Sequence, residues 1–188
     1  MNTIYTFILS FSIIQLTAQS ANIDELKNSL IELKKDNSQK NQREFFNLFP
    51  SSFQSFNNTF GFKNGTAAPL YDGHEYISQF FSLDSIDQRK QLNKWINISI
   101  DGHWDADAVN YFQMYLRLRV FQNLDLTFKL LKERPEKEIK SFFYFFFNEI
   151  HPQYETIPKE FEILKNSDNE LYILILEGHK LAIQDSGH

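Results

Sequence analysis

Apolar residues recur along this chain at intervals of three and four residues, which is the spacing of an amphipathic helix. The clearest case runs from Ile23 to Lys35, where charged residues surround a single apolar stripe made of Ile23, Leu26, Leu30 and Leu33. Similar stripes predict further helices over 43–49, 53–60, 76–83, 91–95, 109–120, 124–132, 158–164 and 171–181. The sequence therefore predicts an all-α fold, an irregular multi-helix globular bundle of roughly eight to ten short helices.

The run from Phe142 to Phe147 is apolar on every side, and its period alone does not distinguish a buried helix from a buried strand. Pro135 stands before it, followed at once by acidic residues, and this combination is typical of the first turn of a helix. We therefore predict a helix at the centre of the core. Phe143 and Phe146 are expected to be buried there rather than to bind a ligand.

Turn and capping residues predict how other elements begin and end. Gly61 is placed to end a helix, and the stretch from Phe62 to Gly73 is expected to be irregular, without a hairpin. Asp84 or Ser85 is expected to cap the helix that follows. Gly178 should interrupt the last helix, in which the residues expected to turn inward are Leu171, Ile175, Leu176 and Leu181.

The stretch from Trp95 to Gln122 holds both tryptophans and the densest set of polar groups beside an apolar run. Asp101-Gly102 is a strong turn signal, because glycine takes positive φ freely. An amphipathic helix follows the turn, on a face made of Val109, Phe112, Leu116 and Val120. The candidate functional loop lies between them and consists of Asp101, His103, Trp104, Asp105 and Asp107.

Two interpretations of this loop remain open. Its alternating acidic residues and histidine could converge on a cation or form an acid/base site, and the spacing matches the first half of a calcium loop. However, Ala106 stands where such a loop needs glycine, and Phe112 where it needs glutamate. The other interpretation makes Asp105 the N-cap of a helix beginning near Ala106, with Asp107 in its first turn. We predict this capping role, and neither a metal site nor a cofactor.

The composition excludes several function classes. The chain has 188 residues and no cysteine, which rules out disulfides, thiolate metal sites and a cysteine nucleophile. Its formal charge of −5 and its lack of a Lys/Arg cluster argue against binding to nucleic acid. It contains no phosphate-binding loop, dinucleotide fingerprint, zinc-protease motif or serine-hydrolase motif.

Aromatic residues are a stronger signal than any acidic pair. Tyrosines combine an apolar ring with a polar tip and suit a protein interface or a sugar-stacking cleft, the alternative being a core whose hydroxyls reach solvent. Glu149 and His151 flank a predicted helix end and could form an acid/base pair or cap the helix. The candidate interface residues are Tyr71, His74, Tyr111, Tyr115 and His151.

The N-terminus has the pattern of a secretory signal peptide. Residues 4–16 form an apolar run without charged residues, and a small-x-small cleavage pattern follows at 18–20. The run is short for a membrane span, which needs about 20 apolar residues, although an uncleaved anchor is the alternative. We predict that residues 1–20 are removed on export. Residues 21–188 are then expected to form a single helical domain, periplasmic or secreted, without stable membrane insertion.

Two runs, WINISIDGHWDADAVNYFQ and EIKSFFYFFFNEIHP, together resemble an uncharacterised family of small, exported, helical bacterial proteins. The upstream runs REFFNLFPSSFQSFNNTFGF and PLYDGHEYISQFF extend the resemblance from Arg43 to Pro158, which is most of the predicted domain. The resemblance implies an exported helical protein and associates it with immunity proteins, which protect a cell from a neighbour's toxin. It supplies no catalytic residue.

Two function classes follow from these observations. The first is an exported, non-enzymatic protein-binding domain with a protein partner, in its sharpest form an immunity protein against a toxin. Export, small size, acidic balance and the lack of catalytic motifs favour it, since an acidic face often opposes a basic cleft. The second is a small exported hydrolase, metal- or acid/base-dependent, using the Asp101–Asp107 loop. We favour the first, and the oligomeric state stays open.

Overall fold

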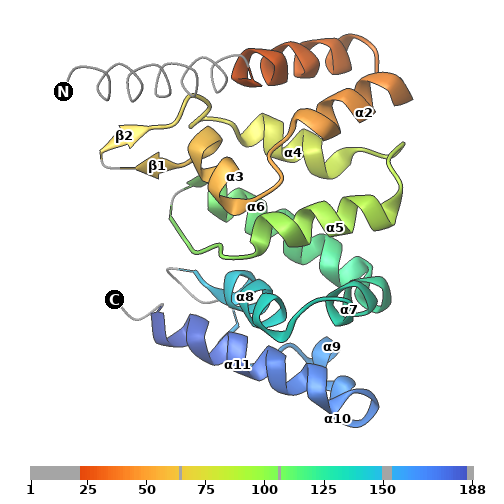
Figure 1. Cartoon of the computed structure of the whole chain (residues 1–188), viewed down its shortest axis with the longest axis vertical. Coiled ribbons are helices and arrows are strands. Elements are labelled where there is room, and N and C mark those ends of the chain that lie inside the picture. The colour runs from red at the N-terminus through yellow and green to blue at the C-terminus, as the bar shows by residue number, and fades with distance from the viewer. Residues whose placement is uncertain (1–21, 64, 106, 150–153, 186–188) are drawn as a thin grey trace, which may run out of the picture. The chain divides into compact units, whose positions relative to one another are not determined.

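The computed structural model describes residues 22–63, 65–105, 107–149 and 154–185, and most of them are helical (Figure 1). Residues 22–35 form the first described helix. The helices that follow are α2 (Gln39–Leu48), α3 (Phe53–Phe60), α4 (His74–Ser82), α5 (Gln88–Ser99), α6 (Asp107–Gln122), α7 (Leu124–Lys132), α8 (Glu136–Phe147), α9 (Lys159–Glu162), α10 (Leu164–Ser167) and α11 (Asn169–Asp185). The prediction of an all-α, multi-helix fold is confirmed. Across the described ranges, no helix is both long and apolar enough to cross a membrane.

The chain divides into two compact units. The first is the described part of Met1–Phe49 together with Leu83–Ile86, and the second is the described part of Pro50–Ser82 and Asp87–His188. The candidate functional loop and the described candidate interface residues all belong to the second unit. A single domain over 21–188 stays a prediction.

In the first unit, a buried glutamine joins α2 to the second segment of that unit. Nε2 of Gln42 donates to Oδ1 of Asp84 at 2.7 Å, and its Oε1 accepts from the backbone N–H groups of Asp84 and Ser85 at 3.0 and 2.9 Å. The cap of α5 is instead Asp87, whose carboxylate accepts from the N–H of Lys90 at 3.0 Å. The prediction that Asp84 or Ser85 caps α5 is wrong, because both residues are engaged by α2.

The aromatic helix α8 belongs to the core of the second unit. Pro135 occupies its N-cap position and Glu136 lies in its first turn. Phe143 and Phe146 have no exposed surface, and the ring of Phe161 lies 5.8 and 5.7 Å from theirs. The predictions of a helix here, and of core positions for Phe143 and Phe146, are confirmed.

The last helix, α11, runs beside α8 and passes Gly178 without interruption (Figure 1). A Cβ at Gly178 would lie 2.7 Å from the Cβ of Phe143 and 2.8 Å from the backbone oxygen of Lys140. The prediction that Gly178 interrupts the helix is wrong, because the glycine allows two helices to pack closely. Leu176 and Leu181 are exposed rather than inward, since the buried face is the one that carries Leu171, Ile175, Gly178 and Ala182.

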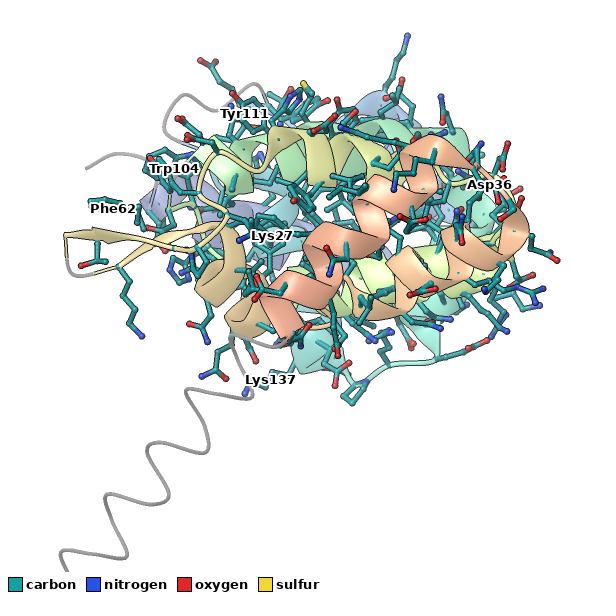
Figure 2. The ribbon with its side chains drawn as sticks, turned by 90° about the horizontal axis from the view of Figure 1, so that it is seen from above. Lys27, Asp36, Phe62, Trp104, Tyr111 and Lys137 are labelled. Carbon is teal, nitrogen blue, oxygen red and sulfur yellow. The ribbon has the colours of Figure 1, made fainter. Side chains whose placement is uncertain are left out.

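The stretch predicted to be irregular contains a short hairpin, which projects from the helices (Figures 1 and 2). Strands β1 (Phe62–Lys63) and β2 (Thr66–Ala67) are antiparallel, with Phe62 opposite Ala67. Gly65 in the turn has a φ of 76°, a left-handed conformation that glycine adopts at little steric cost. The expectation of no hairpin is wrong, although the asparagine-glycine pair in the sequence was a signal for one.

Candidate functional site

The turn at Asp101 and Gly102 is held tightly against α8. Asp101 has a φ of 58°, and its N–H donates to Oγ of Ser141 at 2.7 Å. A Cβ on Gly102 would lie 2.5 Å from the ring of Phe145 and 3.0 Å from that of Phe53, so this close approach requires glycine. The predicted turn is confirmed, but the positive φ falls on Asp101 rather than on the glycine.

The next residues of the candidate functional loop make separate contacts. The exposed ring of His103 lies 4.9 Å from the ring of Phe53. The half-buried Trp104 donates its backbone N–H to Oδ1 of Asn148 at 2.6 Å. Asp107 is exposed in the first turn of α6, as predicted, where its negative charge interacts favourably with the positive end of the helix dipole.

Asp105 is half-buried, and Oδ2 of its carboxylate is buried with no hydrogen-bond partner among the described residues. Among the described residues, no backbone N–H in the first turn of α6 donates to this carboxylate. Ala106 is not one of the described residues. The capping role therefore stays a prediction that the geometry does not support. In the part of the chain that the structure describes, no three His, Asp or Glu side chains are grouped so as to hold a metal ion.

Asp101 and His103 line an open cleft of about 820 Å³ in the second unit. The other walls come from α8, which contributes Lys137, Lys140 and Tyr144, and from α11, which contributes Glu177, Lys180 and Leu181. The remaining acidic residues of the loop, Asp105 and Asp107, are not among the lining residues. The cleft therefore brings together only the first part of the candidate functional loop.

Two polar contacts connect the helices that form the cleft. Nζ of Lys140 lies 3.3 Å from Oε2 of Glu177, and the hydroxyl of Tyr144 donates to Oδ2 of Asp185 at 2.7 Å. Burial and the hydrogen bond to Asp185 raise the pKa of Tyr144 to about 12. The second contact lies closer than the first to the C-terminus of both α8 and α11, so the two helices run in the same direction.

The helix α6 is apolar on two faces. Its buried face is the predicted one, formed by Val109, Phe112, Leu116 and Val120. The opposite face carries Tyr111, Met114, Tyr115 and Leu118, which are also spaced by three and four residues. Met114 and Leu118 are 50% and 51% exposed, and we call these four residues the α6 stripe. Met114 and Leu118 were not among the predicted interface residues, although their spacing with Tyr111 and Tyr115 is visible in the sequence.

Three candidate interface residues come together where α4 meets α6. The ring of His74 lies 4.3 Å from that of Tyr111 and 6.2 Å from that of Tyr115, whose hydroxyl is 3.4 Å from Nε2 of the histidine. Tyr111 lies at the outside of the ribbon (Figure 2). Tyr71 packs instead against Phe62 of the hairpin, with ring centres 5.8 Å apart. His74 thus extends the α6 stripe onto α4.

A buried ion pair joins α6 to the chain just after α8. Arg117 and Glu149 form a salt bridge, and Nε of Arg117 donates to the backbone oxygen of Phe146 at 3.0 Å. Burial lowers the pKa of Arg117, and the charge of Glu149 opposes this effect. Nε2 of Gln113 donates to the backbone oxygens of Phe145 and Asn148 at 2.7 Å each. The network therefore provides hydrogen bonds for carbonyl groups at the C-terminal end of α8. His151, which the sequence offered with Glu149 as an acid/base pair or a helix cap, lies outside the described residues.

Lys94 of α5 has a perturbed acidity that sequence analysis did not foresee. Burial lowers its pKa to about 8, and its Nζ lies 5.8 Å from the ring centre of Phe80 on α4. Shifted pKa values gather at functional sites, but they also occur in packed side chains. Lys94 is not among the residues lining the cleft, and its position over an aromatic ring is typical of packing.

No protein family, curated protein or solved structure matches the chain. The resemblance to exported helical bacterial proteins, carried by the sequence runs quoted above, stays a prediction. Two surfaces of the second unit are candidates for binding: the α6 stripe and the cleft beside the turn at 101–103.

Proposed function

We propose that the chain is an exported, non-enzymatic protein-binding domain that holds its partner on the α6 stripe. The observation that carries this proposal is the second apolar face of α6, where the half-exposed Met114 and Leu118 share one side of the helix with Tyr111 and Tyr115. Aromatic residues and methionine are enriched in protein interfaces, whereas solvated helix faces are usually polar. Methionine also adapts its shape to the surface it meets.

The partner that we propose is a basic protein of the same compartment. The chain has a formal charge of −5, and complementary charge speeds association and disfavours wrong partners. In the narrower form of the proposal, the chain is an immunity protein and the partner is a toxin with a basic cleft. The stripe would supply the apolar contact, and the acidic balance the attraction at longer range.

The alternative is an exported hydrolase using the Asp101–Asp107 loop. One observation favours it, since Asp101 and His103 line a cleft. The residues of the loop nevertheless do not converge on one site, since Trp104 is hydrogen-bonded to Asn148 and Asp107 is exposed on α6. The geometry therefore supports protein binding better than hydrolysis.

Export is supported by the sequence pattern alone, because residues 1–20 lie outside the described residues. If the signal peptide is removed, N-terminal sequencing of the protein taken from its own cells should begin at or near Ala21. Recovery of a chain that begins at Met1 would contradict cleavage and favour the uncleaved anchor.

Replacing Met114 and Leu118 together by aspartate should abolish capture of the partner from the cell envelope. Each charge would be desolvated in the centre of an apolar contact, and losing one hot spot weakens binding by about 30-fold or more. Affinity for the captured protein, once purified, is measured by calorimetry. Because both side chains are half exposed, the far-UV circular dichroism of the variant should match that of the wild type.

Ile163→Asp is the matched control, since Ile163 is 69% exposed and lies between α9 and α10, outside the stripe. A protein bound by the wild type and by this control, but lost by the stripe variant, would support the proposal. Equal binding by all three would show that the stripe is not the binding surface. Sedimentation of the purified chain tests self-association, and a dimer disrupted only by the stripe variant would make a second copy the occupant.

A further inference from the structure

Three lysines and the carboxylates of Asp101 and Glu177 line the cleft beside the turn at 101–103, so the cleft has a small excess of positive charge in an acidic chain. Lys137 and Lys140 of α8 and Lys180 of α11 line it. Lys140 is paired with Glu177 at 3.3 Å. Among the described residues, no salt bridge includes Lys137 or Lys180. Two ammonium groups on neighbouring helices can therefore meet an external anion.

The surface between these lysines is largely apolar. Leu181 lines the cleft with about half of its surface exposed, although it lies on a helix whose other face is well buried. Tyr144 presents its ring beside it, and the bond from its hydroxyl to Asp185 fixes the ring. The phenol of Tyr144 is neutral near pH 7, as an ordinary tyrosine is, so it adds no negative charge. An apolar floor next to lysines suits a ligand with both an anionic and an apolar part.

The walls of the cleft are fixed by contacts that do not depend on a ligand. The N–H of Asp101 is bonded to Ser141, and Gly102 lies against the ring of Phe145. Gly178 brings α11 into direct contact with α8. A ligand would thus have little of the protein to order on binding. The volume of about 820 Å³ also falls in the range of small-molecule sites, about 300–1,000 Å³.

We propose that this cleft binds a small amphipathic anion, with a carboxylate or phosphate head on an apolar chain. Lys137 and Lys180 attract the head as point charges. Leu181 and the ring of Tyr144 contact the apolar chain of the ligand, and this contact removes apolar surface from water. This inference goes beyond the proposed function and uses none of the residues of the α6 stripe, so each can fail without the other.

The full chain is titrated by calorimetry with dodecanoate and with dodecyl phosphate, each below its micelle concentration. Dodecyltrimethylammonium presents the same chain with a cationic head, and acetate and inorganic phosphate present the heads alone. We expect the anionic amphiphiles to bind about tenfold or more tightly than the cation, because two lysines face the head. The heads alone should bind too weakly to detect, since they lack the apolar contact. The preference between the two anionic amphiphiles identifies the head.

Lys137→Gln with Lys180→Gln should weaken binding of the anionic amphiphiles by about tenfold, because it removes both charges while keeping part of each aliphatic stem. Leu181→Ser should weaken binding of these amphiphiles separately, because it removes an apolar contact with their alkyl chain. The matched control is Lys90→Gln with Lys129→Gln, which makes the same charge change at exposed positions on α5 and α7. The control should keep the wild-type affinity within about twofold.

Three outcomes would overturn the proposal. Equal weakening by the control pair would show an effect of net charge alone. Equal affinity for the cationic amphiphile would show contact without charge recognition. Full affinity in both cleft variants would place the binding elsewhere in the chain.

Discussion

Replacing Phe143 by alanine is expected to lower the free energy of unfolding by about 3–5 kcal/mol. The side chain is fully buried, with the rings of Phe142 and Phe161 at 5.1 and 5.8 Å. Gly178 of α11 already packs against its Cβ, so the two helices cannot move closer to fill the space. The lost contacts are therefore not regained. Urea unfolding followed by far-UV circular dichroism measures the change.

Phe62→Ala is the matched control, because it makes the same change at an exposed ring on the hairpin. Its effect should stay within about 0.5 kcal/mol. Phe143→Leu keeps most of the volume and should lose about 1 kcal/mol. A wild-type midpoint for Phe143→Ala would mean that this side chain is exposed in solution, and the aromatic face of α8 would then mark an interface.

The elements that the sequence predicts well are those decided by neighbouring residues. Pro135 and the acidic residues after it identify α8 as a helix despite its strand-like run of phenylalanines. The cap of α5 was misplaced for the opposite reason. Asp84 is engaged by Gln42, which stands 42 residues earlier, and no local pattern reveals that bond.

An apolar residue in a helix does not by itself reveal which face is buried. In α11, Leu171 and Ile175 face inward whereas Leu176 and Leu181 do not, because Gly178 determines the side on which α8 approaches. The orientation follows from the shape of two helices together. A glycine amid apolar residues is the signal that could have indicated it.

The candidate surfaces differ in the same way. The α6 stripe lies within one helix, so the periodicity of its own sequence contains it. The cleft is built from the turn at 101–103, from 137–144 on α8 and from 177–184 on α11. Asp101 and His103 could therefore be selected from the sequence, but their neighbouring lysines could not, because only the packing of α8 and α11 brings those lysines near.

Replacing Arg117 by methionine is expected to lower the free energy of unfolding by about 3–5 kcal/mol, because the charge of Glu149 stays buried without its cation. Methionine fills similar space, so the loss reflects charge more than packing. The double variant Arg117→Met with Glu149→Met should recover most of this loss, since burying the pair is itself costly. The lowered pKa of Arg117 has the same origin. A deficit of about 1 kcal/mol should remain from the lost bond to the carbonyl of Phe146.

The exposed pair of Lys35 and Glu32 is the control. Its nitrogen and oxygen are 2.7 Å apart, but the side chains are 65% and 59% exposed, so Glu32→Gln should cost at most about 1 kcal/mol. Urea unfolding at a single pH compares the variants. If Arg117→Met lost no more than this control, the buried pair would be solvated in solution and would not hold the end of α8. If the double variant were as unstable as the single one, the loss would come from the bond to Phe146 rather than from the charge of Glu149.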